Sequence, residues 1–348
     1  MTLPARQPLL PLLLQRRLLI VTGKGGVGKS TIAAALAWRA AEAGQRVLAC
    51  EFDAKGELAT ALSGAGPITS SAGTRFVPDE LHPNLWVMAM DPEASLREYL
   101  RRNLHLPFVG KVGPLSSAFD FLANAAPGVR EIVTMGKVAW EAKERNYDLV
   151  VVDATSTGHI MGQLRAPLAI NELVGVGLIR NQTAWMLEIL NDPSITGLVV
   201  TTTADETPVS ETIELCGAVT RETGVGLAAV IVNRVLADLF VPESPGGPPA
   251  ERKAFARLLS AGSPARRRFE LAVGGGDAAA RLLEAAVIAD ELHTQQQVNI
   301  DHLVDRLADQ TAALGDPIPL AFIPQLFGVE VGLPTTRGVA AALEDAFV

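Results

Sequence analysis

Short, almost continuously apolar runs alternate along the chain with longer segments whose apolar positions recur at helical spacing. These runs, rich in β-branched residues, are residues 17–22, 46–52, 84–90, 147–154, 195–202, 227–235 and 318–325. A strand that is apolar on both faces is typical of a parallel sheet with helices on both sides. The pattern therefore predicts an α/β fold built on a doubly wound, mostly parallel sheet flanked by helices.

Two stretches depart from this alternation. Residues 92–146 predict several helices and no strand, with Pro127 placed to start one of them. Residues 237–315 open with a Pro/Gly-rich loop and continue as helices, including a long one from about Asp277. We therefore expect three parts. The core comprises residues 17–91 and 147–236, and residues 316–330 return to it; residues 92–146 form a helical insertion, and residues 237–315 form a helical C-terminal segment.

The first apolar run leads into a glycine-rich turn, "VTGKGGVGKS", and then into strong helix formers that end at Gly44. Gly23 to Ser30 fits the G-x-x-x-x-G-K-[ST] pattern in the strand, loop and helix context that a phosphate-binding loop requires. Glycines let backbone N–H groups approach phosphate oxygens, and the helix directs its positive end at the same anion. The pattern predicts that Lys29 contacts the β- and γ-phosphates and that Ser30 binds Mg²⁺. The backbone amides expected to hold phosphate are those of Gly25, Gly26, Val27, Gly28, Lys29, Ser30 and Thr31.

Two aspartates follow apolar strands beside this loop. Asp153 ends "LVVV" and Asp53 ends the second predicted strand. Ligands in such sheets bind beyond the carboxyl ends of the strands, so both carboxylates are expected near the phosphates. Asp153 is the predicted partner of Mg²⁺.

Composition limits the class of protein. The chain has 348 residues, is 48% hydrophobic, and carries 30 Lys plus Arg against 38 Asp plus Glu, a net charge of -8. This charge disfavours nucleic acid as a partner, although a local basic patch remains possible.

Cys50 and Cys216 are far apart and predict neither a disulfide framework nor a zinc site. Cys50 lies in a predicted strand, where a small buried hydrophobic side chain is expected. The apolar N-terminal "PLLPLLLQRRLLIV" is too short for a membrane span and has no signal cleavage site, so we expect a cytoplasmic protein, with peripheral membrane association left open.

Several motifs together resemble one family. Residues 24–30 form a phosphate loop with an additional early lysine, as in the MinD, ParA and ArsA groups. The stretch "DATSTGHI", residues 153–160, is similar to the D-T-A-P-T-G-H-T signature of the arsenite-pump (ArsA) and tail-anchored-protein-targeting (Get) ATPases. Residues 206–212, "ETPVSET", and Asn233 in "IVNRV" match further segments of that family. The resemblance extends from about residue 17 to residue 327.

The resemblance implies a dimeric ATPase that uses ATP and Mg²⁺ and closes and opens as it turns over. Lys24 would reach across the dimer interface to the phosphates bound by the other subunit, where a cation stabilises the charge of the transferring phosphoryl group. Asp53 would orient the attacking water. Asn233 would read the adenine ring, and Pro324 and Gln325 would wall the base.

The switch loops depart from the family pattern. The first switch reads D-P-A-H or similar in the family, whereas residues 53–57 here are Asp-Ala-Lys-Gly-Glu, without the proline. In the second switch, which includes residues 157–159, Ser156 stands where the family has proline and Ile160 where it has threonine. Both loops are therefore expected to move differently from those of the family.

The client is less constrained. Arsenite suits clustered thiolates, which two separated cysteines cannot supply within one chain, so arsenite handling is not expected. The eukaryotic targeting branch uses a C-x-x-C zinc clamp and a methionine-rich groove, and this chain has no such motif and only dispersed methionines; no zinc is expected. Either a client groove or core packing would account for the apolar residues of the predicted insertion: Phe108, Phe119, Phe121, Leu122 and Trp140.

The sequence thus predicts a Mg²⁺-dependent ATPase that pairs with an identical or related chain and couples hydrolysis to a protein or membrane-associated client. One alternative is a regulatory, nucleotide-binding subunit of a heterodimer with little activity alone. Another is a MinD- or ParA-like positioning ATPase. A MinD-like protein would have a basic amphipathic C-terminal helix, whereas the end of this chain, "GVAAALEDAFV", is acidic. A ParA-like protein would need a basic patch to bind DNA, and "ARRRFE", residues 265–270, is the one compact basic run in the sequence.

Overall fold

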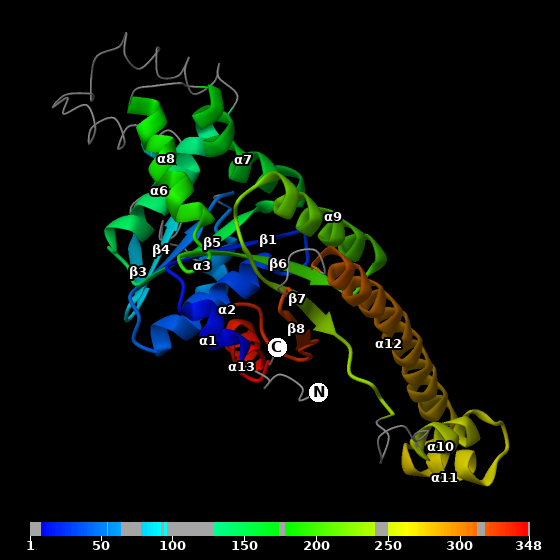
Figure 1. Cartoon of the computed structure of the whole chain (residues 1–348). Helices are drawn as coiled ribbons and strands as arrows, with labels where there is room; N and C mark the ends of the chain where they lie inside the picture. Colours follow the sequence, from blue (N-terminus) through cyan, green and yellow to red (C-terminus); the bar gives the residue numbers. More distant parts are fainter. Residues whose placement is uncertain are drawn as a thin grey trace.

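A single mixed sheet runs through the molecule and carries helices on both faces (Figure 1). The computed structural model describes residues 8–53, 55–63, 78–91, 94–95, 128–173, 178–240, 250–311 and 317–346. The strands are β1 (Leu18–Gly23), β2 (Val47–Glu51), β3 (Asp79–His82), β4 (Leu85–Ala89), β5 (Leu149–Ser156), β6 (Thr196–Thr203), β7 (Leu227–Val235) and β8 (Leu320–Pro324).

The sheet has the order β3-β4-β2-β5-β1-β6-β7-β8, and every neighbouring pair is parallel except β3 with β4. The predicted doubly wound, mostly parallel α/β sheet is confirmed, and each apolar run of the sequence forms one of its strands. The sequence reading missed β3, a short antiparallel strand at the edge of the sheet. Its sequence, "DELH", has one apolar residue, Leu81, and no β-branched residue, so it contains no apolar run of the kind on which the prediction relied.

The helices divide between the two faces of the sheet (Figure 1). One face carries α1 (Leu9–Leu14), α2 (Lys29–Glu42), α3 (Glu57–Leu62) and α13 (Leu333–Glu344). The other carries α6 (Val129–Glu144), α7 (Thr157–Leu173), α8 (Leu178–Asn191), α9 (Glu206–Glu222) and the C-terminal part of α12 (Gly276–Thr311).

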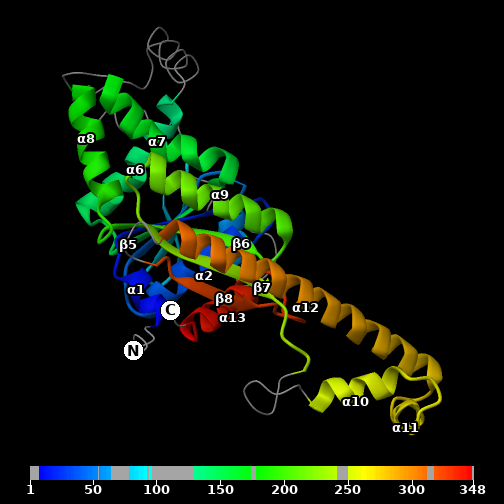
Figure 2. The same cartoon turned by 45° about the vertical axis from the view of Figure 1, so that its right-hand side comes forward.

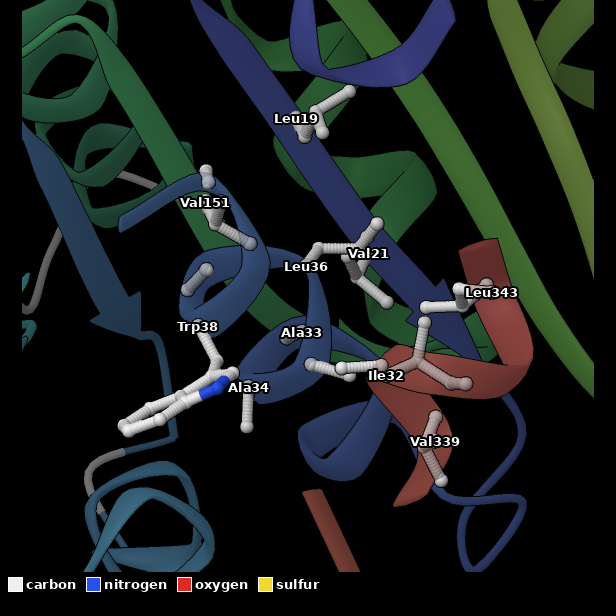
Figure 3. Close-up of a cluster of buried hydrophobic side chains, with 14 of the residues drawn as sticks. Leu19, Val21, Ile32, Ala33, Ala34, Leu36, Trp38, Val151, Val339 and Leu343 are labelled. Carbon is white, nitrogen blue, oxygen red and sulfur yellow. The ribbon is translucent and has the colours of Figure 1, made fainter. Parts of the chain in front are cut away.

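Alternate residues of the central strands enter two separate cores. In β1, Leu19 and Val21 join the cluster beneath α2 and α13, whereas Leu18 and Ile20 join the cluster on the opposite face. Figure 3 shows the first cluster, with Ile32 of α2 directed toward α13 and the strand residues above it. Both faces of the strand are thus withdrawn from water, which is why the strands read as unbroken apolar runs.

The N-terminal apolar segment forms the short helix α1, whose leucines pack into the first cluster. Leu9 is fully buried, and its N–H donates a hydrogen bond to the carbonyl oxygen of Ala346 near the other end of the described chain. Within the described residues, no helix is both long enough and apolar enough to cross a membrane.

The C-terminal helical segment projects from the core as an arm (Figure 2). Its distal part consists of α10 (Ala250–Leu259), α11 (Pro264–Ala272) and the N-terminal part of α12. The predicted long helix from about Asp277 corresponds to α12, which begins at Gly276. In the predicted helical insertion, residues 92–93 and 96–127 lie outside the described part of the chain, and with them Pro127, Phe108, Phe119, Phe121 and Leu122.

Candidate functional site

The phosphate loop lies between β1 and α2, at the carboxyl edge of the middle of the sheet. Gly26 and Gly28 have φ angles of 86° and 95°, in the left-handed region that glycine adopts without a steric penalty. A Cβ atom on Gly28 would collide with the Asn233 side chain, which donates a hydrogen bond from Nδ2 to the Val27 carbonyl oxygen at 2.9 Å. The end of β7 therefore holds the loop closed, and only glycine fits at position 28.

The start of α2 is open to an anion. No side chain caps this helix and its first turn contains no acidic residue. Lys29 is its first residue, with Nζ at 3.5 Å from the Lys24 carbonyl oxygen on the other side of the loop. Free amides at a helix N-terminus, beside a lysine, match the charge and the hydrogen-bonding needs of a phosphate group. The residues present therefore fit the polyphosphate of a nucleotide.

One edge of this cradle is acidic. Asp153, in β5, is buried, with 5% of its surface exposed. Its Oδ1 atom has no hydrogen-bond partner among the described residues. Burial raises the pKa of Asp153 to about 7, against the opposing effects of the Ser30 hydroxyl and the Lys29 charge. The Ser30 Oγ atom donates to Glu57 Oε2 at 3.2 Å.

A buried carboxylate with an unused oxygen beside a hydroxyl fits a hard divalent cation such as Mg²⁺. Across the described residues, no group of three or more His, Cys, Asp or Glu is placed to hold a metal ion. A cation here would take one carboxylate and one hydroxyl from the chain and its remaining ligands from phosphate and water, as Mg²⁺ commonly does.

The first switch segment is anchored by a carboxylate that the sequence reading missed. Glu51, the last residue of β2, is buried and accepts backbone hydrogen bonds from Lys55 and Gly56 at 3.0 Å each and from Glu57 at 3.2 Å. Burial raises the pKa of Glu51, and these N–H bonds act against that rise. The available signal was an acid inside an apolar strand, "LACEF", because such a group needs local partners.

Asp53 lies next to this anchored turn on the exposed side. Its carboxylate is exposed and has Lys55 Nζ at 3.5 Å from Oδ2. Glu51, two residues earlier, is the register partner of Asp153 in the parallel pair β2 and β5. Asp53 therefore follows the strand that borders Asp153, and no hydrogen bond joins it to the phosphate loop in the described structure.

Lys24 is engaged within its own chain. Its Nζ atom lies 2.5 Å from Oε1 of Glu211 in α9. The other carboxylate oxygen of Glu211 accepts a hydrogen bond from Thr157 Oγ1 at 3.0 Å. Glu211 belongs to the "ETPVSET" segment, but its contact with Lys24 was not predicted, because 187 residues separate the two in sequence.

The residues predicted at the base lie further along the same edge. Asn233 is buried, and its contact in the structure is with the loop carbonyl. Pro324 pairs with Val235 in the parallel strands β7 and β8, and the Gln325 N–H donates to the Val235 carbonyl oxygen at 2.8 Å. The structure thus brings Asn233 to the loop and places Pro324 and Gln325 beside the end of β7. Neither of the latter two hydrogen-bonds the loop in the described parts of the chain.

Comparison with known proteins agrees with the fold and with this loop. Residues 16–186 match the ArsA family described as anion-transporting ATPase. The chain is 32% identical over 224 residues to the ATPase BagA of Mycobacterium tuberculosis, covering 63% of this chain and 65% of that protein. It thus spans less than two thirds of that relative.

More distant relatives carry the names of two branches. An ATPase get3 of Schizosaccharomyces japonicus is 32% identical over 181 residues, 49% of this chain and 52% of that protein. A putative arsenical pump-driving ATPase of Halobacterium salinarum is 27% identical over 241 residues, 64% of this chain and 36% of that protein. The matched residues 16–186 include β1, the phosphate loop, β2, β5 and both switch segments. Residues 16–186 therefore form a domain of the ArsA type, and the fold, the loop and these relatives support an ATPase of the ArsA/Get type.

Proposed function

We propose that the chain is a Mg²⁺-dependent ATPase that hydrolyses ATP as a dimer and couples this cycle to a protein or membrane-associated client. The observation that carries the proposal is the cradle formed by the left-handed glycines, the uncapped start of α2 and the amine of Lys29. It presents several N–H donors and one cation to a single anion, which suits the β- and γ-phosphates of a nucleotide.

Each residue has a distinct proposed role. Lys29, Ser30, Thr31 and the loop amides from Gly25 onward bind and orient the phosphates. Ser30 and Asp153 hold Mg²⁺. When bound, this ion neutralises phosphate charge that develops during hydrolysis. Asn233 contacts the adenine while its amide also closes the loop, and Pro324 and Gln325 border the base.

Asp53 is proposed to position the attacking water. It stands at the end of β2, in the exposed turn that Glu51 fixes by three backbone hydrogen bonds. A loose phosphoryl-transfer transition state mainly requires a water held in line, so an exposed carboxylate that becomes covered on dimer closure is sufficient.

We further propose that the client is not arsenite. Cys50 and Cys216 are both buried, and burial raises the pKa of each thiol, so neither is readily available as a thiolate ligand. Cys50 lies in β2, as expected of a small buried hydrophobe. A protein or membrane-associated client remains part of the proposal by analogy with the family alone.

Turnover by the purified chain tests the proposal. Phosphate release from ATP and Mg²⁺, measured over a range of protein concentrations, should rise per subunit as the chain pairs with itself. Lys29→Ala removes a charged contact and should weaken nucleotide binding at least about tenfold. Lys253→Ala, on the exposed surface of α10, is the charge-matched control and should bind normally. Binding without turnover at every concentration would instead favour the regulatory subunit of a heterodimer.

A mixing experiment tests Lys24 and Asp53 together. Lys24→Ala and Asp53→Asn should each bind ATP and each lose turnover by about 100-fold or more. If Lys24 acts across the interface, a mixed dimer contains one site with both groups intact. An equal mixture should then recover about a quarter of the normal turnover, because half of random dimers are mixed and each has one working site. If the mixture recovers nothing, Lys24 serves its own site and the proposed arrangement is wrong.

A further inference from the structure

One carboxylate on α9 connects the phosphate loop with the second switch segment. Glu211 Oε1 is 2.5 Å from Lys24 Nζ, and Glu211 Oε2 accepts from the Thr157 hydroxyl at 3.0 Å. Both carboxylate oxygens are therefore in use, one for each segment. Thr157 is the first residue of α7 and follows β5, the strand that carries Asp153.

We infer that Glu211 is a positioning residue that holds Lys24 within its own chain and releases it when the second switch segment moves. The inference rests on the proposed role of Lys24 in a dimer. An amine bound to Glu211 is not available to a phosphate bound by another subunit, so the two contacts compete for the same cation.

The ion pair between Lys24 and Glu211 is weak enough for a bound phosphate to replace the carboxylate. The side chains of Lys24 and Glu211 are 34% and 33% exposed, so water screens their attraction. The hydrogen bond from Lys24 lowers the pKa of Glu211, which is therefore a charged partner at neutral pH. An exposed pair stabilises its geometry only weakly, and a triphosphate with several charges can displace the carboxylate.

Thr157 gives this restraint a connection to the nucleotide. Its hydroxyl holds the second carboxylate oxygen and so limits the positions that Glu211 can adopt. Thr157 lies four residues after Asp153, at the same edge of the sheet as the phosphate loop. A shift of residues 156–158 toward bound phosphate would break this hydrogen bond, and the ion pair between Glu211 and Lys24 would become weaker.

The first test compares dimer formation by two variants of α9. Glu211→Gln keeps the size of the side chain and removes its charge. Glu214→Gln removes an exposed charge on the same helix that makes no ion pair in the described structure. With Mg²⁺ and a slowly hydrolysed ATP analogue, sedimentation should show half-maximal dimer formation at a two- to fivefold lower concentration for Glu211→Gln, the effect of losing one weak ion pair. Glu214→Gln should match the unmodified chain.

The same change in a chain that already carries Lys24→Ala should have no effect, because Glu211 then has no amine to hold. An unchanged or higher midpoint for Glu211→Gln would overturn the inference. So would an equal shift in the Lys24→Ala background, since Glu211 would then act through another contact.

A second test reads the contact directly and does not depend on hydrolysis or pairing. Without nucleotide, a brief treatment with an amine-acylating reagent should label Lys24 at least twofold faster in Glu211→Gln, relative to the exposed Lys253. An unchanged labelling ratio would overturn the inference whatever the enzyme does. If the unmodified chain never dimerises, the proposed dimeric function fails, and this ratio still decides whether Glu211 holds Lys24.

Discussion

At the scale of single residues, two glycines share a backbone conformation but differ in their surroundings. Gly28 and Gly44 have φ angles of 95° and 88°, both in the left-handed region. A Cβ atom on Gly28 would collide with Asn233, whereas one on Gly44 would meet nothing within 4 Å. The two positions therefore separate the cost of backbone strain from the cost of losing the closed phosphate loop.

This contrast gives a prediction for alanine at each position. Gly44→Ala should lower the free energy of unfolding by about 1 kcal/mol, because a left-handed backbone disfavours a side chain. Gly28→Ala should lower it further, because its methyl group would also collide with the Asn233 side chain. Gly28→Ala should also weaken nucleotide binding at least about tenfold, since its methyl group displaces Asn233 and opens the loop. Urea unfolding and a nucleotide titration on both variants provide the measurements. Equal nucleotide affinities for the two variants would contradict the role of Asn233 as the closure of this loop.

At the scale of elements, the sequence predicted the pieces that carry a local pattern. The strands other than β3 were predictable because each contains an apolar run. The central strands are withdrawn from water on both faces, whereas the residues of the edge strand β8 alternate between buried and exposed. The phosphate loop was predictable because its glycines and Lys29 stand at fixed spacing between a strand and a helix.

Contacts between distant segments carry no such pattern. Glu51 holds a turn that follows it directly, but its signal is one acid in an apolar strand, which does not say what the acid binds. Glu211 and Lys24 meet because α9 begins directly after the carboxyl end of β6, at the edge of the sheet where the loop after β1 also lies. The sequence therefore indicated which residues gather around the glycine-rich loop better than which groups restrain them.

One pair of elements offers a test by pH. Arg46, just before β2, pairs with Asp148, just before β5. The backbone N–H and the Nη2 atom of Arg46 donate hydrogen bonds to the Asp148 carboxylate at 2.8 and 2.9 Å. These hydrogen bonds lower the pKa of Asp148 below its usual value. A carboxyl group with a lowered pKa in the folded state stabilises that state above its unfolded pKa and loses this contribution as the pH falls.

Asp148→Asn should therefore show a lower urea midpoint than the unmodified chain at pH 7. The difference should be small, because the pair is exposed, and it should shrink as the pH falls below about 4. Asp301→Asn, an exposed aspartate of α12 without an ion pair in the described structure, is the control and should unfold with the unmodified chain. A difference that stays constant down to pH 3 would show that the charge of Asp148 does not matter.

At the scale of the whole molecule, the core and the arm differ in how much they bury. The C-terminal part of α12 packs Ile300, Leu303 and Leu307 into the cluster beside β6 and β7. At the tip, α11 has no buried residue, and Leu271 is 84% exposed. The arm is therefore fixed to the core at one end, and its tip is held mainly by contacts among its own helices, such as the ion pair between Arg252 of α10 and Asp290 of α12.

Local stability should follow this gradient of burial. Amide protons open by local unfolding at a free energy set by the contacts that are lost, so segments with little apolar burial exchange first. In dilute, nucleotide-free protein, the amides of α10 and α11 should exchange at least about tenfold faster than those of residues 299–311, because their opening exposes less apolar surface. A tenfold difference corresponds to a local opening free energy that is lower by about 1.4 kcal/mol. Hydrogen exchange followed by mass spectrometry measures both segments in one sample. If α10 and α11 were equally protected, a surface absent from the single chain would have to cover them, and a dilution series would show whether that surface is a second copy.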